Sequence, residues 1–391
     1  MQLETLRLLA AHDGAGERSV EVELVAPAPR REHAAIEAAL APLCRPRLVD
    51  ARPLPLPLAV LRAARRREPV TAARHRLGAV AREVVRAAAA RAVDVVHAEQ
   101  VQAMPQALAA GRPVLLRAQN VESELWRGAH PGVGGTERGL ASARPTAGAR
   151  GSLRHHEASR VERWEAAMLR RAALTLAVTE RDAAALAALA PGARVEALPV
   201  PFPAELPAGP PLASEPAISL LAGAGWQPNR EGAEAFVLRS WPLVRHSLPS
   251  ARLHLFGDVR AAGEGVVRHA APHDAGVAFA AGSILVVPLA VASGVRMKVL
   301  EAWARGVPVV ATPAAAAGLD AAHGDELLIA DMGEPLANAL VTLARDAALR
   351  ARLVRSAREL LRRRHDPRAL RARLLAGYAA AAATASGRDS R

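Results

Sequence analysis

The stretch ILVVPLAVASGVRMKVLEAWARGVPVVA, residues 284–311, decides the fold. Its opening run, Ile284 to Val287, and its closing run, Val307 to Ala311, are short and apolar, which predicts two buried strands. Between them, Ser293 and Gly294 form a turn that precedes a helical pattern. A strand, a helix and a second strand in this order predict one strand-helix-strand unit of a parallel sheet.

The same alternation continues in both directions and predicts an α/β protein with two doubly wound, Rossmann-like domains. Its 391 residues exceed what one hydrophobic core usually organises. The proline-dense segment 201–216 can form neither a helix nor a central strand, so it is interpreted as a linker. We expect one domain over residues 1–200, a second over 217–365, and a helix with a tail over 366–391. The expected strands are Val20 to Ala26, Val93 to His97, Pro113 to Ala118, Leu174 to Val178, Val195 to Pro199, Ile218 to Ala222, Arg252 to Phe256, Ile284 to Val287, Val307 to Ala311 and Glu326 to Ile329.

Composition indicates a globular protein, because 51% of the residues are hydrophobic and 23% are charged. Cys44 is the only cysteine, so no internal disulfide can form and a reducing compartment is expected. Glu4 and Arg7 interrupt the first residues, which argues against a signal peptide. The uncharged stretch 275–295 is divided by glycines and a proline, which argues against a membrane span. We therefore expect a cytoplasmic location.

A formal net charge of +13 predicts a polyanionic partner. The arginines cluster at Arg62, at Arg65 to Arg67 and at Arg362 to Arg364, in helical patterns without interleaved aromatic residues. Nucleic acid is not expected, because no base-stacking surface is indicated. Solvated helix faces are the simpler interpretation of these clusters, and peripheral contact with an anionic membrane face is the functional alternative.

Glycine and polar residues follow one expected strand of the second domain, at the end where open parallel sheets bind ligands. Gly223 and Gly225 come after the strand that ends at Ala222, and Asn229 is expected to cap the next helix. Glycines let a phosphate approach the backbone, and a helix start offers free amides. Tight-turn glycines without any ligand are the alternative interpretation.

Lys298 is the only lysine among 51 lysines and arginines. We expect it to lie with Arg296 in the first turns of the helix that follows Ser293 and Gly294, where two cations and the helix amides form a site for a diphosphate. Glu301 is expected on the same side of the helix, suited to hold a ribose diol. In the alternative interpretation, Lys298 and Glu301 form a surface ion pair of small value.

The wider string resembles the donor-site signature of group 1, or family 4, glycosyltransferases. The resemblance covers roughly residues 90–365 and is strongest after 217. Two further segments are similar to the branch that makes bacterial polysaccharides and envelope glycans. The residues that carry the signature are Val286 to Pro288, Ser293 to Ala302, Ala304 to Thr312 and Gly318, and those that indicate the branch are Trp226 to Asn229, Trp241 with Pro242, Pro249 to Gly257, and Arg117 to Ser123.

This resemblance implies a GT-B enzyme, in which two Rossmann-like domains face each other across a cleft and the helix in 366–391 returns toward the first domain. It implies transfer of a sugar from a nucleotide diphosphate sugar to a lipid-linked or polysaccharide acceptor, with retention and without a metal or another cofactor. Lys298 and Arg296 would then stabilise the departing diphosphate. The implied donor-binding residues are Gly223, Gly225, Asn229, Ser293, Gly294, Val295 and Glu301.

In the first domain, His97 matches the family's active-site histidine, although a strand-end histidine is often a packing residue. Arg117, Asn120 and Glu122 are assigned to the acceptor side, and a helix cap is the simpler interpretation of the last two. His155, His156 and Glu157 lack metal-ligand spacing, so no metal site is expected there.

The sequence also departs from the family. The family often has two glutamates eight positions apart, and here Glu301 matches the second while Ser293 occupies the first. Ser293 or backbone amides would therefore contact the donor sugar. Ala224 and Glu231 stand where the family has an arginine and a lysine near Trp226, so Lys298 and Arg296 would replace that charge.

The chain opens with a helical pattern, Leu3 to His12, where the family has a strand and a glycine-rich loop. The first domain is therefore expected to lack its first strand, because of either a misplaced start codon or a truncation. Three rivals to the transferase stay open: a catalytically inactive remnant that binds nucleotide sugar or an assembly partner, a basic nucleic-acid-binding protein, and a sugar-nucleotide epimerase.

Overall fold

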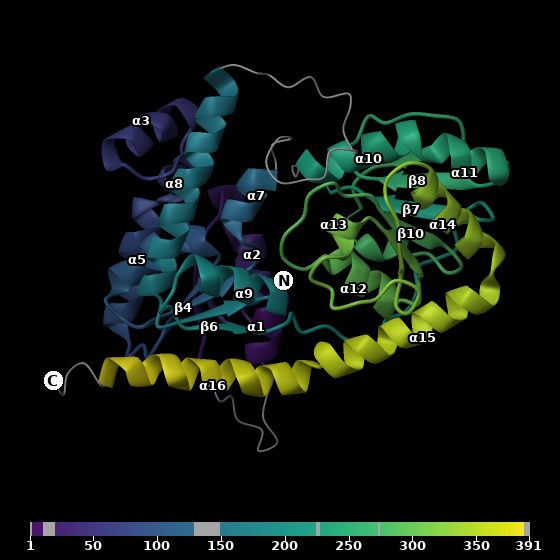
Figure 1. The fold of residues 1–391 in the computed structure, drawn as a ribbon. Helices are drawn as coiled ribbons and strands as arrows, with labels where there is room; N and C mark the ends of the chain where they lie inside the picture. The colour runs from purple at the N-terminus through teal and green to yellow at the C-terminus, as the bar shows by residue number, and fades with distance from the viewer. Residues whose placement is uncertain (1, 11–19, 129–148, 224–226, 273, 387–391) are drawn as a thin grey trace. The chain divides into compact units, whose positions relative to one another are not determined.

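The computed structural model describes residues 2–10, 20–128, 149–223, 227–272 and 274–386 (Figure 1). The described chain forms two compact units. The first contains the residues before 128, the residues from 149 to 201 and the segment from Pro367 onward, and the second contains Phe202–Asp366. Every paired strand of the described residues is parallel, which confirms the expected α/β class.

The second unit is built on a six-stranded parallel sheet with the order β12-β11-β10-β7-β8-β9. The chain lays down β7, β8 and β9 in one direction and then returns to the other side of β7 with β10, β11 and β12. The strand order therefore reverses between β7 and β10. The strands are β7 (Ala217–Leu221), β8 (Arg252–Phe256), β9 (Val266–His269), β10 (Ile284–Val287), β11 (Val309–Ala311) and β12 (Leu328–Ile329).

Helices cover both faces of this sheet, because successive side chains of a strand point to opposite faces. Ile284 and Val286 of β10 pack into one core, and Leu285 and Val287 pack into the other. The first core includes residues of α10 (Gln227–Arg239), α11 (Trp241–Ser247) and α14 (Glu334–Arg345). The second includes residues of α12 (Met297–Ala304), α13 (Pro313–Ala316) and the later turns of α15 (Ala347–Arg364).

The proline-dense segment lies along the second unit. The Phe202 amide donates to His365 O at 2.9 Å, the Leu206 amide to Ala304 O at 2.9 Å, and the Gly209 amide to Phe279 O at 2.9 Å. Ala204 and Leu206 also pack against the core that contains α12. From Phe202 onward, this segment is therefore part of the packed unit.

The first unit contains two parallel sheets, a two-stranded one, β1-β2, and a four-stranded one, β3-β4-β5-β6. No strand of the described residues joins the two sheets. The strands β2 and β9 were not expected from the sequence. The strands are β1 (Glu23–Pro27), β2 (Arg45–Val49), β3 (Val96–Glu99), β4 (Val114–Ala118), β5 (Leu174–Ala177) and β6 (Val195–Ala197).

The four-stranded sheet also has two covered faces. Val114 and Leu116 pack toward α6 (Met104–Ala107), α8 (Ala149–Arg171) and α9 (Glu180–Leu189). Leu115 packs on the opposite face against α1 (Gln2–Ala10) and α16 (Pro367–Ser386) (Figure 1). The helix expected near residue 3 is therefore present as α1. The remaining helices of this unit are α2 (His33–Leu40), α3 (Leu56–Arg66), α4 (Val70–His75), α5 (Gly78–Ala90) and α7 (Glu122–Gly128).

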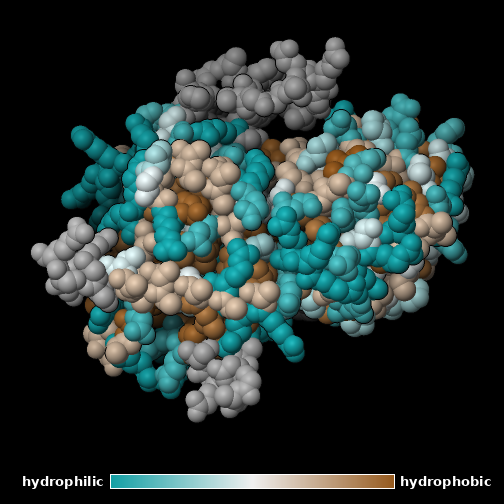
Figure 2. Space-filling model, turned by 60° about the horizontal axis from the view of Figure 1, so that its bottom comes forward, coloured by the Kyte–Doolittle hydropathy of each residue, from teal (hydrophilic) through white to brown (hydrophobic). Residues whose placement is uncertain are grey.

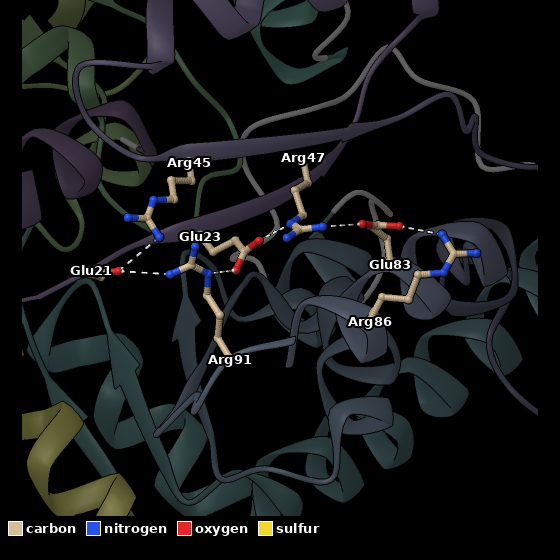
Figure 3. A network of polar contacts seen from close by, with 7 residues as sticks. All are labelled: Glu21, Glu23, Arg45, Arg47, Glu83, Arg86 and Arg91. Carbon is tan, nitrogen blue, oxygen red and sulfur yellow. Dashed lines mark hydrogen bonds and ion pairs between the residues drawn. The ribbon is translucent and has the colours of Figure 1, made fainter. Parts of the chain in front are cut away.

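Ion pairs join the two-stranded sheet to α5 (Figure 3). Arg47 of β2 pairs with Glu23 of β1 and, at 3.2 Å, with Glu83 of α5. Arg86 extends this chain by pairing with Glu83 at 2.8 Å. None of the strand residues in β1 or β2 is fully buried, so charges replace much of the usual apolar contact here. At the other end of the network, Arg45 and Arg91 pair with Glu21, and Arg91 also pairs with Glu23.

Helix α16 turns a row of alanines outward while its leucines pack against the sheet. Its apolar outer surface lies on the face seen in Figure 2. Small side chains of this kind leave little apolar area in water. In the part of the chain that the structure describes, no helix has both the length and the apolar character needed to cross a bilayer. The exposed alanines are Ala369, Ala372, Ala376, Ala379 and Ala383.

Candidate functional site

Lys298 lies where the strand order of the second unit reverses. It is the second residue of α12, which follows β10, yet its Nζ reaches the neighbouring strand β7. The ammonium donates to Leu221 O at 2.6 Å and to Asn229 Oδ1 at 2.9 Å. In open parallel sheets, ligands bind beyond the carboxyl ends of the strands at this reversal. The only lysine of the chain therefore occupies the position that favours a ligand most.

The ammonium of Lys298 donates to two neutral oxygens. Among the described residues, no carboxylate forms an ion pair with it. Burial, and to a smaller extent the positive charge of Arg296, together lower the pKa of Lys298 to about 8. A buried ammonium without a counterion is costly and marks a candidate functional site. An anionic ligand would supply the missing charge.

Arg296 has a different position from the expected one. The helix begins at Met297, so Arg296 is the residue before its first turn. Its guanidinium is buried and donates to Ser293 O at 3.2 Å and to Ala317 O. Arg296 thus fixes the loop before α12 to the segment after α13, and it acts on Lys298 through its charge.

The other residues expected around Lys298 divide into two groups. Ser293 and Gly294 lie in the loop that Arg296 holds, where Gly294 adopts a φ of +70°, and Val295 packs against the core that contains α12. Glu301 instead forms an ion pair with Arg305 at 3.0 Å, one turn later on the same helix. The alternative of a surface pair between Lys298 and Glu301 is therefore wrong, because Lys298 turns toward β7.

The turn after β7 completes this site. Asn229 lies inside α10, so it does not act as the helix cap that the sequence suggested, and its amide oxygen accepts from Lys298. Gly232 allows α10 to lie this close to β10, because a Cβ there would stand 2.3 Å from Pro288 O. Gly223 lies two residues after the end of β7. A Cβ at this position would stand 3.8 Å from Asn229 Nδ2. Gly225 lies outside the described residues.

The site continues along the carboxyl edge to β8 and β9. Gly257 follows β8 with a φ of +127°, and a Cβ there would stand 1.9 Å from Ala222 O at the end of β7. Next to it, His269 at the end of β9 stacks on Phe256, with ring centroids 4.3 Å apart. A surface cavity of about 380 Å³ lies at these strand ends, lined by Gly257, Asp258, Arg268, His269, Ala270 and Ala271.

Sequence reasoning did not single out this cavity. The signal was available, because Gly257 and Asp258 directly follow an expected strand, in the same way as Gly223 follows β7. A second cavity, of about 510 Å³, lies beside α13, where Asp320 is the only charged residue among the described ones that line it. Because this lining offers no cation, the cavity is a poor site for a phosphate.

In the first unit, His97 lies on β3 and contacts α16. Its Nδ1 is 2.6 Å from Tyr378 Oη, and its Nε2 is 3.6 Å from Glu99 Oε1. Burial lowers the pKa of His97, Arg117 lowers it further, and Glu99 opposes the change. Burial also raises the pKa of Tyr378. The neutral histidine with its proton on Nε2 fits this arrangement, because Tyr378 can donate to Nδ1 while the Nε2 proton faces a carboxylate.

The residues that the resemblance assigns to the acceptor side lie in the same unit. Arg117 is buried on β4 and donates to Pro199 O at 3.1 Å. Glu122 accepts hydrogen bonds from Asn120 and Gln102, and burial raises its pKa. Arg117, Asn120 and Glu122 therefore each form hydrogen bonds with other groups of the protein.

Glu165 of α8, which sequence reasoning missed, caps the helix α7. Its carboxylate accepts from the amides of Glu122 at 2.8 Å and Ser123 at 3.0 Å. Burial raises the pKa of Glu165 to about 7. The cap that was sought in Asn120 and Glu122 is thus supplied from another helix.

Among residues 155–157, Glu157 has partners within the protein. Glu157 accepts from the Val70 amide and lies 3.9 Å from Arg160. Within the described ranges, no three histidine, cysteine, aspartate or glutamate side chains gather closely enough to hold a metal ion.

Comparisons with known proteins agree with this geometry. Residues 217–346, which carry the switch-point lysine, match the family model described as glycosyl transferases group 1. No curated protein matches the chain.

Solved structures are similar over most of the chain. Alr3699/HepE from Anabaena, in complex with UDP and glucose, has a TM-score of 0.66 at 15% identity, covering 97% of this chain and 95% of that one. Sucrose-phosphate synthase from Thermosynechococcus elongatus has a TM-score of 0.61 at 16% identity, covering 86% and 83%. Trehalose 6-phosphate synthase from Burkholderia multivorans has a TM-score of 0.54 at 14% identity, covering 82% and 75%. The chain therefore has the α/β fold of GT-B glycosyltransferases, and its residues 217–346 match the glycosyl transferases group 1 family.

Proposed function

We propose that this protein is a glycosyltransferase that uses a nucleoside diphosphate sugar as donor. The observation that carries the proposal is the buried ammonium of Lys298, which lies at the switch point of the sheet and donates to two neutral oxygens, with no carboxylate of the described residues paired to it. The group 1 family match over the same unit supports it, and so do the similar structures, one of which holds UDP and glucose.

In this proposal, the donor lies along the carboxyl edge of the second unit. Its diphosphate binds beside Lys298 and the turn at Gly223, and its nucleoside extends past Gly257 toward His269. Gly257 lets the chain after β8 lie directly beside Ala222, because a Cβ there would stand 1.9 Å from Ala222 O. The cavity at the ends of β8 and β9 is lined by the imidazole of His269 and by the carboxylate of Asp258, which could contact a nucleoside.

Lys298 would then stabilise the leaving group, which is the nucleoside diphosphate. As the bond between the sugar and the diphosphate breaks, negative charge grows on the diphosphate, and a preorganised cation in a site of low dielectric stabilises it. Lysine suits this position better than arginine, because its compact ammonium fits between Leu221 O and Asn229 Oδ1. Arg296 supports this step indirectly, by holding the loop and adding positive potential.

The remaining parts of the proposal extend to the first unit and to the reaction type. His97, neutral with a proton on Nε2, can donate a hydrogen bond to a sugar hydroxyl. Arg117, Asn120 and Glu122 belong to the acceptor side, and the acceptor is a lipid-linked glycan or a polysaccharide. Transfer proceeds with retention and without a metal, so chelation by EDTA is expected to leave turnover unchanged.

Calorimetric titration with UDP and the other nucleoside diphosphates tests the donor site. We expect Lys298→Met to weaken binding at least about tenfold, since it removes the one buried charge that faces the ligand. Lys298→Arg should weaken it too, because a planar guanidinium does not fit the same two acceptors. Arg363→Met is the matched control, because it removes one positive charge at an exposed position of α15.

Two results would overturn the proposal. One is a wild-type protein that binds no nucleoside diphosphate, and the other is equal affinity in Lys298→Met and Arg363→Met. Donor turnover is measured separately, as release of free nucleoside diphosphate from a nucleoside diphosphate sugar. Tight binding without any turnover over a panel of acceptors would favour the inactive remnant over the transferase.

A further inference from the structure

Helix α3 carries its large apolar side chains on the outside. Leu56 is 58% exposed and Leu61 is 68% exposed, and Leu58 and Val60 are also about half exposed, at 53% and 49%. The side chains that α3 buries are the small ones of Ala59 and Ala63. An ordinary surface helix has the opposite arrangement, with large apolar residues inward.

The exposed apolar residues of α3 form one continuous strip. At 3.6 residues per turn, Leu56, Val60 and Ala64 follow one another along the helix, with Pro57 and Leu61 beside them. Arg65, Arg66 and Arg67 are exposed at the carboxyl end of this strip. We call this the α3 surface: Leu56, Pro57, Leu58, Val60, Leu61, Ala64 and Arg65 to Arg67.

Hydrogen bonds from neighbouring segments fix the orientation of α3, with the apolar strip on its outer side. Arg62 turns away from the strip and donates to Ala73 O at 3.3 Å and Arg76 O at 3.0 Å, which fastens α3 to α4. Arg160 of α8 donates to Ala63 O at 2.9 Å from the inner side. The alanines on the inner side let these neighbours approach closely, so the apolar strip faces solvent as a fixed feature.

The charge around the strip identifies its partner. From Ala51 to Arg67 the sequence contains five arginines and no acidic residue. This segment therefore adds to the net charge of +13 without internal compensation. An apolar strip bordered by arginines matches the boundary of an anionic bilayer, where acyl chains meet phosphate groups. Because α3 has only 11 residues, it can lie in this boundary but cannot span the bilayer.

We propose that the α3 surface docks on an anionic lipid surface, with the helix parallel to the membrane plane. Leu56, Val60 and Leu61 enter the region between headgroups and acyl chains, and Arg65 to Arg67 contact lipid phosphates. This goes beyond the proposed transferase activity and does not depend on it, since no residue of the α3 surface belongs to the donor site.

Vesicle co-sedimentation of the full chain tests the inference. The vesicles contain phosphatidylcholine alone or with one third of phosphatidylglycerol. We expect binding to the anionic vesicles and little binding to the neutral ones. Leu56→Ser with Leu61→Ser should lower the partition coefficient at least about tenfold, and so should Arg65→Gln with Arg66→Gln, since apolar contact and charge both contribute.

Matched controls separate the α3 surface from general effects. Leu238→Ser removes another highly exposed leucine, 77% exposed, from the second unit. Arg355→Gln with Arg363→Gln removes the same charge from α15. Both controls should bind anionic vesicles as the wild type does. Circular dichroism melting and UDP titration should be unchanged in all variants, which keeps this test separate from that of the donor site.

Four outcomes would overturn the inference. The wild type could fail to bind anionic vesicles, or it could bind both kinds of vesicle equally. The α3 variants could bind as tightly as their controls. Finally, sedimentation equilibrium could show a dimer that Leu56→Ser with Leu61→Ser abolishes, without lipid binding, in which case the strip would be an interface between copies of this chain.

Discussion

At the scale of single residues, Lys298 is a cation whose surroundings favour its neutral form. Two hydrogen bonds to neutral oxygens do not replace the water that burial removes, so its pKa falls from 10.5 to about 8. A change of this size corresponds to about 3 kcal/mol of preference for the neutral amine. A bound diphosphate would reverse this preference, since it adds negative charge where no carboxylate of the described residues pairs with Lys298.

The depressed pKa of Lys298 gives a prediction for stability against pH. Between pH 8 and 10.5 the unfolded chain retains the Lys298 proton that the folded chain has lost, so the free energy of unfolding should rise with pH. Urea unfolding over this range measures it, with Lys298→Met as reference. We expect the wild type to gain up to about 3 kcal/mol relative to the variant. Parallel profiles of the two proteins would contradict the buried ammonium.

A second prediction concerns the His97 proton. Tyr378→Phe removes the hydroxyl next to Nδ1, so the neutral form with the Nε2 proton loses a hydrogen bond. The pKa of His97 should therefore rise, and the two neutral forms should become mixed. Glu99, Arg117 and the Tyr378 hydroxyl are the ionisable groups that act on this ring.

The measurement for His97 is nitrogen NMR of its imidazole, assigned with a His97→Gln variant. Its two ring nitrogens give distinct shifts, which report the protonated position directly and do not require any turnover. A spectrum that is identical in the wild type and Tyr378→Phe, over the whole titration, would show that Tyr378 only fills space. Melting curves of both proteins check that the fold is intact.

Sequence reasoning reached some of these residues and missed others for physical reasons. Lys298 was conspicuous because it is unique, and its position after a strand indicated its role. Glu301 was assigned to a ribose because it shares a helix with Lys298, and the ion pair that it forms with Arg305 on the same helix was not expected. Tyr378 is 281 residues from His97, and only the packing of α16 on the sheet brings them together.

At the scale of elements, the strands that could be predicted were those with continuous apolar runs. Strand β10, with Ile284 to Val287 all buried, is an example. Strand β2 was not predicted because Arg45–Val49 contains a proline and two arginines and therefore lacks a continuous apolar run. Arg47 of this strand forms an ion pair with Glu83 of α5, which lies 36 residues further along the chain. Local patterns do not carry that information.

The charged attachment of β1 and β2 predicts sensitivity to mutation. Arg47 joins Glu23 of β1 and Glu83 of α5, so Arg47→Met should open the two-stranded sheet to solvent more often. Hydrogen exchange of the amides in Glu23–Pro27 and Arg45–Val49 measures this opening. We expect faster exchange in the variant, and a similar but smaller effect of high salt on the wild type.

Arg86→Met provides the control for this element. Arg86 pairs with Glu83 of its own helix, at the outer end of the same network. Its replacement removes the same charge but leaves the link between the strands and α5 in place. Equal exchange rates in Arg47→Met and the wild type would mean that backbone pairing alone holds the sheet, without help from the ion pairs.

At the scale of the whole molecule, the two units have separate cores. In the second unit both faces of one sheet are covered by helices of the same unit. In the first unit one face is covered by α6, α8 and α9, and the other needs α1 and α16, from opposite ends of the chain. The sequence could indicate two α/β domains, but not that Leu9 and Leu374 share one core.

These separate cores predict two unfolding transitions, and a mutation or a ligand should be able to change the stability of one unit without changing that of the other. Leu374→Ala leaves a cavity against Leu115 and Leu174, which should destabilise the first unit by about 2–5 kcal/mol. Leu340→Ala is the matched change in the second unit, where Leu340 is equally buried. UDP, by the proposed function, should stabilise only the second unit. Urea unfolding followed by hydrogen exchange of peptides from each unit measures both. If Leu374→Ala and UDP shift the peptides of both units together, the units unfold as one cooperative structure, and the division of the molecule into two separate cores would not describe its stability.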